Sequence, residues 1–228
     1  MHTTVREQTG PPRAVLFDLD GTLLDTAPDM AGALNALRVE RAAKPLPFAM
    51  VRPQVSHGAA ALVRLGFPDA GDTEHEALRV RFLELYRARL ADETRPFAGV
   101  PELLAAIERA AVPWGVVTNK PAWLTDPLLQ ALGLGSRAGV IVSGDTVAER
   151  KPHPLPLIHA AQSLGLLPAE CLYVGDAERD VQAARAAGMQ VLVALFGYID
   201  PLAAPRDWPA DGWISTPQEV LGWLCRSA

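Results

Sequence analysis

The stretch of residues 14–24 constrains this chain of 228 residues more than any other part of it. Ala14–Phe17 is a short apolar run with a β-branched residue, which is typical of a buried strand. Asp18 and Asp20 follow directly, and Gly21 then interrupts the extended pattern. If the strand continues through Asp20, the two carboxylates share a face, and such a pair repels unless a cation or a shared proton compensates. The pattern therefore indicates a divalent metal site, with a solvated strand end before a glycine turn as the alternative.

Composition argues against several classes of partner. The net charge of −5 disfavours nucleic acid and anionic membranes. No apolar run approaches the roughly 18 residues needed to cross a bilayer, and the polar N-terminus holds no apolar signal region. Cys171 and Cys225 lack a metal-ligand spacing, so we interpret them as one core thiol and one thiol near the C-terminus. We expect a cytoplasmic protein, because disulfides are rare there.

The spacing of apolar residues divides the chain into two kinds of pattern. Between residues 25 and 95 it predicts no convincing strand and three helices, one from about 25 to 41, one over 59–65 and one over 73–90. The last helix has one apolar stripe, formed by Leu78, Phe82, Leu85, Tyr86 and Leu90. From residue 96 onward strands and helices alternate. The predicted strands there span 114–118, 139–143, 172–175, 190–195 and 213–214, and the predicted helices span 101–110, 121–132, 155–164, 178–187 and 217–225.

This alternation predicts an α/β fold, a three-layer Rossmann-like parallel sheet covered by helices on both faces. The all-helical stretch is then an insertion after the first strand. We expect a core domain of residues 13–24 and 96–228, a helical domain of residues 25–95, and a flexible tail of residues 1–12.

Polar side chains follow four of the predicted strands. In parallel sheets ligands bind beyond the carboxyl ends of the strands, so these side chains are expected to converge at one edge. They are Asp18 and Asp20 after the first strand, Thr118, Asn119 and Lys120 after the second, Lys151 beyond the third, and Asp176 and Asp180 after the fourth. The 21 basic residues include 3 lysines only, which favours specific sites for Lys120 and Lys151. Lys120 has the alternative of an exposed residue before Pro121.

These motifs resemble those of the haloacid dehalogenase superfamily. The run Asp18-Leu19-Asp20-Gly21-Thr22 matches the family's first motif, Thr118 its second, Lys151 its third, and Gly175-Asp176 through Asp180 its fourth. The resemblance covers the chain from Arg13 onward and implies a phosphatase with a small helical cap. Asp18 would be the nucleophile that forms an aspartyl-phosphate, and Asp20 the general acid and base, as their chemistry also suggests.

The resemblance also implies a Mg2+ site and a phosphate site. The Asp18 carboxylate, the Asp20 backbone carbonyl and Asp176 would hold Mg2+. Asp180 would orient waters or pair with Lys151, or would only favour a helix dipole. Thr118 and Asn119 suit phosphate oxygens, and Lys151 supplies a positive charge to the transferring phosphoryl group.

The closer resemblance is to phosphoglycolate phosphatases, which makes 2-phosphoglycolate the first candidate among small phosphorylated metabolites. N-acetylmuramic acid 6-phosphate phosphatases are hard to separate from them on the run 114–121 and on Gly197-Tyr198-Ile199. Both substrates carry a carboxylate, for which Arg52, Arg64 and His57 are candidate partners; backbone N–H groups of 56–58 are a further possibility.

Two further alternatives and the oligomeric state are open at this point. A β-phosphoglucomutase-like phosphomutase would use the same aspartyl-phosphate but return the phosphoryl group to a sugar hydroxyl. A non-catalytic binding protein is the other alternative, but no catalytic position of the family is missing from the sequence. The chain is expected to act as a monomer or a homodimer.

Overall fold

A six-stranded sheet forms the centre of the computed structural model, which describes residues 10–200 and 202–225. The strand order is β5-β4-β1-β6-β7-β8, and every pair is parallel. The strands are β1 (Ala14–Phe17), β4 (Trp114–Val117), β5 (Val140–Val142), β6 (Cys171–Gly175), β7 (Gln190–Ala194) and β8 (Gly212–Ile214). The predicted parallel α/β sheet is therefore confirmed; the first nine residues of the predicted tail lie outside the described residues.

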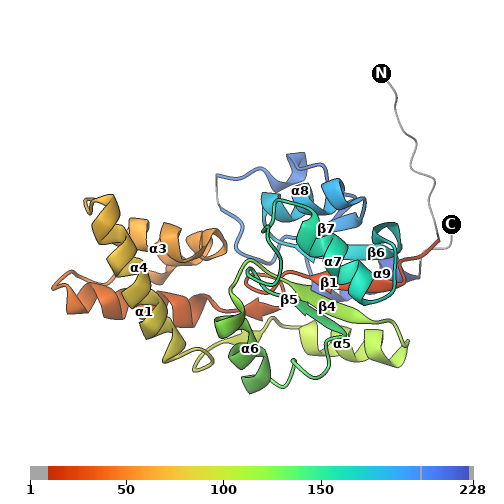
Figure 1. Ribbon diagram of the computed structural model, residues 1–228, viewed down its shortest axis with the longest axis horizontal. Coiled ribbons are helices and arrows are strands. Elements are labelled where there is room, and N and C mark those ends of the chain that lie inside the picture. The colour runs from red at the N-terminus through yellow and green to blue at the C-terminus, as the bar shows by residue number, and fades with distance from the viewer. Residues whose placement is uncertain (1–9, 201, 226–228) are drawn as a thin grey trace.

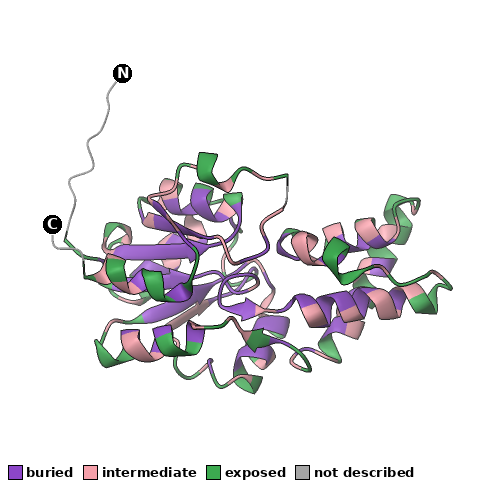
Figure 2. Cartoon of the chain, turned by 180° about the vertical axis from the view of Figure 1, so that it is seen from behind, coloured by how far each residue is buried: buried purple, intermediate pink, exposed green. Residues whose placement is uncertain are grey.

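Helices cover both faces of this sheet, as the buried strands in Figure 2 illustrate. Alternate residues of β1 enter different cores: Val15 and Phe17 pack with α5, α6 and α9, whereas Ala14 and Leu16 pack with α7 and α8. The helices are α5 (Val100–Arg109), α6 (Ala122–Ala131), α7 (Leu155–Ser163), α8 (Glu178–Ala187) and α9 (Val220–Leu224), with short 3-10 turns η2 (Pro168–Glu170), η3 (Pro205–Asp207) and η4 (Pro217–Glu219). This alternation is the period-two pattern expected of strands that are buried on both faces.

The remaining helices form a helical block that stands to one side of the sheet in Figure 1. Its elements are α1 (Ala27–Glu40), α2 (Phe48–Val51), η1 (Arg52–His57), α3 (Gly58–Gly66) and α4 (Asp72–Arg87). The longest helix, α4, packs against α1 and α3 through a buried core that includes Leu34, Leu62 and Phe82. The sequence predicted α1, α3 and α4 but not α2 and η1, which are too short to show a helical period.

Two short strands join the helical block to the sheet, which corrects the prediction that residues 25–95 contain no strand. The strands β2 (Leu24–Asp25) and β3 (Arg95–Pro96) pair antiparallel where the chain leaves the core and returns to it. The fully buried Asp29 of α1 holds the same junction, because its carboxylate accepts hydrogen bonds from the N–H groups of Glu93 and Thr94. Two-residue strands carry no periodic signal, so sequence patterns could not predict them.

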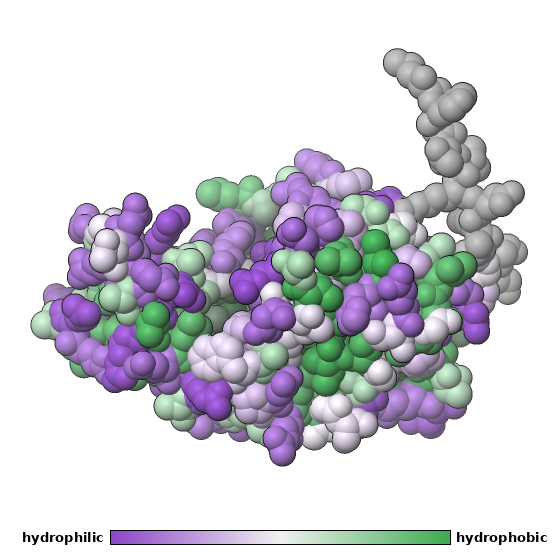
Figure 3. All heavy atoms as spheres, in the orientation of Figure 1, coloured by the Kyte–Doolittle hydropathy of each residue, from purple (hydrophilic) through white to green (hydrophobic). Residues whose placement is uncertain are grey.

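The surface and the cysteines agree with the sequence analysis. Cys171 is buried, Cys225 is exposed and both are free. Mostly hydrophilic residues cover the helical block on the face that Figure 3 shows. Over the described part of the chain, none of the helices combines the length and the apolar character that a membrane span requires.

Candidate active site

The strand order brings the predicted site residues together at one edge of the sheet. β1 lies between β4 and β6, so Asp18 at the end of β1 has Thr118 on one side and Asp176 on the other. All three side chains are buried. The first, second and fourth predicted motifs thus meet as expected for the carboxyl edge of a parallel sheet.

Asp18 and Asp20 do not continue one strand, which corrects the expectation that they share a strand face. β1 ends at Phe17, and the carbonyl of Leu19 then accepts hydrogen bonds from the N–H groups of Thr22, Leu23 and Leu24. Gly21 makes this turn possible, because its φ is +86° and a Cβ there would lie 2.2 Å from an oxygen of Asp176. The turn therefore gives the two acids different surroundings.

Lys151 compensates the charge of Asp18 and of Asp180. Its fully buried ammonium lies 3.0 Å from Asp18 Oδ1 and 2.8 Å from Asp180 Oδ1, and it donates to the hydroxyl of Tyr173 at 2.7 Å. The N–H of Leu19 also donates to Asp18 Oδ1, at 2.7 Å. Within the described residues the other oxygen of Asp18, Oδ2, receives no such donor, so it is the oxygen available for chemistry.

The side chain of Asn119 holds the backbone of Lys151. Its amide donates to the Lys151 carbonyl at 2.8 Å and accepts from the Lys151 N–H at 3.0 Å. Both polar atoms of the Asn119 side chain are thereby occupied. A phosphate contact from Asn119 stays a prediction, and the observed contacts give this residue the task of positioning Lys151.

Lys120 forms a second, separate ion pair with Asp20. Its ammonium lies 2.8 Å and 3.0 Å from the two Asp20 oxygens, and the hydroxyl of Thr26 donates to the same carboxylate at 2.7 Å. Burial alone would lower the pKa of Lys120, but Asp20 and the neighbouring Tyr86 raise it overall. Lys120 is buried, so the alternative of an exposed residue is wrong.

Asp176 connects the sheet edge to the helical block. One of its oxygens, Oδ2, accepts hydrogen bonds from the hydroxyl of Ser56 at 2.7 Å and from the N–H of Tyr198 at 2.9 Å. The guanidinium of Arg179 donates to the carbonyl of the same Ser56 at 2.5 Å. Burial, followed by the charges of Asp18 and Asp180, raises the pKa of Asp176 to about 7.

The donor set suits a hard divalent cation. Oxygens of Asp18, Asp176 and Asp180 lie within 4.8 Å of one another, and all three residues are buried. Burial also raises the pKa of Asp18 despite the opposing charge of Lys151. Such crowded carboxylates are the ligands that Mg2+ prefers, and a bound cation would offset their repulsion. Among the residues described, Asp180 is paired with the ammonium of Lys151, whereas the donors to Asp176 are all neutral and Oδ2 of Asp18 is free of donors, so Asp18 and Asp176 are the better candidate ligands.

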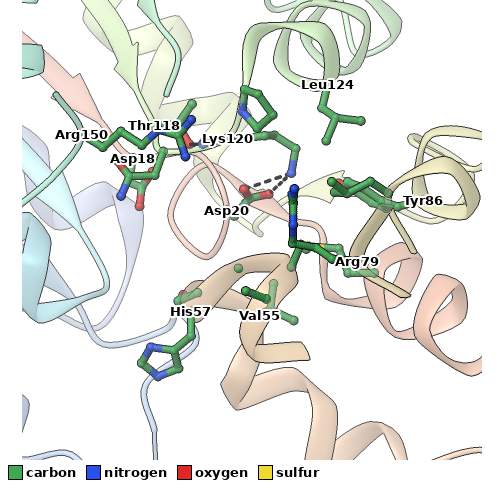
Figure 4. A pocket seen from close by; sticks show the side chains of 18 of the residues that line it. Asp18, Asp20, Val55, His57, Arg79, Tyr86, Thr118, Lys120, Leu124 and Arg150 are labelled. Carbon is green, nitrogen blue, oxygen red and sulfur yellow. Dashed lines mark hydrogen bonds and ion pairs between the residues drawn. The ribbon is translucent and has the colours of Figure 1, made fainter. Parts of the chain in front are cut away.

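A cavity of about 790 Å3 lies between this edge and the helical block (Figure 4). Asp18, Asp20, Thr118, Asn119 and Lys120 line it from the core. Of the three cations predicted to face a substrate carboxylate, His57 lies at this cavity, with its exposed ring turned away from Asp20 in Figure 4.

Arg52 and Arg64, which the sequence analysis named as candidate partners of a substrate carboxylate, do not line the cavity. Arg52 instead stacks on the ring of Tyr198, 4.9 Å from its centroid, and Arg64 is exposed. The sequence around an isolated arginine does not indicate which aromatic ring the side chain will contact, so it could not separate these two arginines from His57.

Four residues of the site escaped the sequence prediction. Tyr86 was predicted only as part of an apolar stripe, and Tyr173 lies within a buried strand, where aromatic residues are ordinary. Arg79 is one of three arginines in α4, and the sequence does not distinguish it from the other two. Arg179 lies inside the fourth motif, and this position between Asp176 and Asp180 was the one available signal.

The fold and the site define a hydrolase class, and comparison with known proteins identifies it. The family model for haloacid dehalogenase-like hydrolases matches residues 15–194. The chain therefore belongs to the haloacid dehalogenase-like hydrolase family.

Particular relatives are similar over almost the whole chain. A phosphoglycolate phosphatase of Xylella fastidiosa strain Temecula1 is 47% identical over 206 residues, which is 90% of each chain. An N-acetylmuramic acid 6-phosphate phosphatase of Pseudomonas aeruginosa is 44% identical over 216 residues, covering 94% of this chain and 96% of the relative. The crystal structure of a predicted phosphoglycolate phosphatase from Haemophilus somnus 129pt matches with a TM-score of 0.83 at 27% identity, covering 92% and 96% of the two chains.

The positioning of Lys151 by Asn119 can be tested against a matched pair elsewhere. Asn35 holds the backbone of Leu46 through the same two hydrogen bonds, at 3.0 Å and 2.8 Å, away from the cavity. We expect Asn119→Ala and Asn35→Ala each to lower the free energy of unfolding by about 1–3 kcal/mol, measured by urea titration. Only Asn119→Ala is expected to reduce turnover of p-nitrophenyl phosphate, because only that change releases Lys151. Equal turnover in the two variants would contradict the assigned task.

Proposed function

We propose that this chain is a Mg2+-dependent phosphatase that hydrolyses a small phosphate monoester through an aspartyl-phosphate on Asp18. The observation that carries the proposal is the setting of Asp18: a buried carboxylate at the end of the central strand, 3.0 Å from the ammonium of Lys151 and facing the cavity. We further propose that residues 25–95 act as a cap over a core of residues 13–24 and 96–228, and that the enzyme works in the cytoplasm.

The first half of the reaction transfers the phosphoryl group to Asp18. Oδ2 of Asp18 attacks phosphorus and the P–O bond to the substrate's alcohol breaks. Asp20, which this proposal requires to have exchanged its pairing with Lys120 for a proton when substrate is bound, gives that proton to the departing alkoxide. The hydroxyl of Thr118 and the ammonium of Lys151 stabilise the charge on the transferring oxygens. The contact of Thr26 with Asp20 keeps the acid beside the cavity during this step.

The second half returns the enzyme to its starting state. A water molecule attacks phosphorus of the aspartyl-phosphate and gives its proton to Asp20, the P–O bond to Asp18 breaks, and inorganic phosphate leaves. One acid thus donates and then accepts the same number of protons. The helical block limits the access of other water to the cavity.

Mg2+ would be held by the carboxylates of Asp18 and Asp176 together with the backbone carbonyl of Asp20, with Asp180 in support. When bound, it would neutralise charge on the phosphoryl oxygens and fix their orientation. The donors from Ser56, Tyr198 and Thr22 orient the Asp176 carboxylate for this purpose.

Two substrates are proposed, each supported by a different observation. The 47% identity to a relative that is named phosphoglycolate phosphatase makes 2-phosphoglycolate the first candidate. The cavity of about 790 Å3 favours N-acetylmuramic acid 6-phosphate, because a two-carbon acid would leave most of that space to water. The 44% identity to a relative of that name gives the second candidate equal standing as a homologue.

A panel of phosphate monoesters separates these substrates. We expect kcat/KM for 2-phosphoglycolate or for N-acetylmuramic acid 6-phosphate to exceed that for p-nitrophenyl phosphate by at least about tenfold, since specific contacts add to the common phosphate site. Failure of both to reach this ratio would reject both assignments. β-glucose 1-phosphate belongs in the panel, because its conversion to glucose 6-phosphate would instead indicate a phosphomutase.

The nucleophile and the metal can be tested together with Asp18→Asn. We expect the wild type to hydrolyse substrate with Mg2+, to lose activity in EDTA, and to yield a phosphorylated Asp18 peptide after acid quenching and mass spectrometry. Asp18→Asn is expected to form no phosphoenzyme, because an amide is not a nucleophile here. The exposed Asp126→Asn provides the control. A phosphoenzyme in Asp18→Asn would refute the assignment of the nucleophile.

The contribution of Lys151 can be tested with Lys151→Ala. We expect kcat to fall by about 10²- to 10³-fold, as for the loss of one preorganised electrostatic contact. Lys44→Ala removes an exposed lysine outside the cavity and is expected to leave kcat unchanged. Near-normal turnover in Lys151→Ala would rule out a role in phosphoryl transfer.

A further inference from the structure

We propose that Arg79 and Tyr86 of α4 form a second anion subsite in the cavity, where the carboxylate of the substrate binds. The inference rests on the proposed phosphatase function and narrows its substrates to phosphate monoesters that also carry a carboxylate. The phosphate end of such a ligand would lie at Asp18, and its carboxylate end at the wall that the helical block contributes.

The periodicity of α4 places both residues on the cavity wall. Arg79, Leu83 and Tyr86 follow one another at spacings of four and three, so they share one face of the helix, and all three line the cavity. The neighbouring positions Leu78 and Phe82 are fully buried in the core of the helical block. In Figure 4 the side chains of Arg79 and Tyr86 point toward the region of Asp20 and Lys120.

The buried hydroxyl of Tyr86 lacks a hydrogen-bond acceptor. Tyr86 is fully buried, and its hydroxyl makes no hydrogen bond of normal length among the described residues. The neighbouring ammonium of Lys120 can donate to this hydroxyl but cannot accept its proton. Its ring is fixed between Phe82, at 6.3 Å between centroids, and the ammonium of Lys120, 4.7 Å from the centroid. Buried hydroxyls are normally hydrogen-bonded, so this one points to an acceptor supplied by a ligand. Burial raises the pKa of Tyr86 to about 12, so the hydroxyl keeps the proton that it would donate.

The guanidinium of Arg79 has donors to spare. Its Nε and Nη2 contact Glu76 at 2.8 Å and 2.6 Å, in a pair whose side chains are 36% and 61% exposed. This pair uses the Nε and Nη2 edge of the guanidinium and leaves Nη1 without a partner among the described residues. A guanidinium has five N–H donors, and its planar edge matches a carboxylate. Glu76 does not line the cavity, whereas Arg79 does.

The lysine and the other arginines that line the cavity already have partners, and the exposed ring of His57 is turned away from Asp20 (Figure 4). Lys120 is neutralised by Asp20, and Arg179 donates to the carbonyl of Ser56. Arg150 donates to the carbonyl of Gly144, beside the loop that carries Lys151. Arg79 is thus the arginine that the helical block directs at the far end of a bound substrate.

The substrate preference of Arg79→Gln tests this inference. We expect kcat/KM for N-acetylmuramic acid 6-phosphate to fall by about 10- to 100-fold, the size expected for a lost charge-assisted contact. For N-acetylglucosamine 6-phosphate and ethyl phosphate, which lack the carboxylate, kcat/KM should change by less than about threefold. Tyr86→Phe should show the same selectivity with a smaller loss, and Arg79→Lys should recover part of the activity.

A matched control and a binding measurement keep this result separate from the proposed function. Arg81→Gln removes an equal charge from α4, outside the cavity, and should alter neither class of substrate. Calorimetry with N-acetylmuramic acid and N-acetylglucosamine measures the subsite without hydrolysis: Arg79→Gln should weaken binding of the acid by about tenfold and spare the neutral sugar. That binding result would support the subsite even if no phosphate were hydrolysed. Equal effects of Arg79→Gln on acids and neutral counterparts would overturn it, even in an active phosphatase.

Discussion

The buried charge cluster around Lys151 is the constraint on which the rest of the structure depends. One ammonium lies within 3.0 Å of two carboxylates, and a third, Asp176, has an oxygen within 4.8 Å of theirs. Such a group is costly to bury unless every member has a partner. Three features hold this cluster in position: the strand order β4-β1-β6, the Asn119 amide and the Tyr173 hydroxyl.

The two acids of the first motif show how the repulsion between two nearby carboxylates is reduced. The turn after β1 separates them, and each acquires its own lysine, Lys151 for Asp18 and Lys120 for Asp20. Both acids line the cavity, but the Asp18 side chain is almost fully buried beside other acids, whereas that of Asp20 is more exposed and accepts a hydrogen bond from Thr26. Different surroundings are what allow two identical side chains to take up different chemical tasks.

The sequence permits prediction of the sheet and of the residues at its edge, because alternating strands and helices require parallel crossovers and parallel strands align their carboxyl ends. It does not permit prediction of the turn that follows β1, since this turn depends on the carbonyl of Leu19 and on the closeness of Gly21 to Asp176. Tyr86 was predicted as a core residue, which is correct for its ring and misses its hydroxyl. A periodic pattern reports burial, and it cannot report which buried atom lacks a partner.

Ser56 links the helical block to the sheet edge through two hydrogen bonds. Its hydroxyl donates to Asp176 and its carbonyl accepts from Arg179, so one residue of the block is tied at two points to the fourth motif. Any rotation that lifts the block from the edge must remove a donor from a buried carboxylate. If Asp176 binds a cation as proposed, the position of the block and the affinity of that carboxylate for the cation are energetically coupled, so a change in one alters the other by the same free energy.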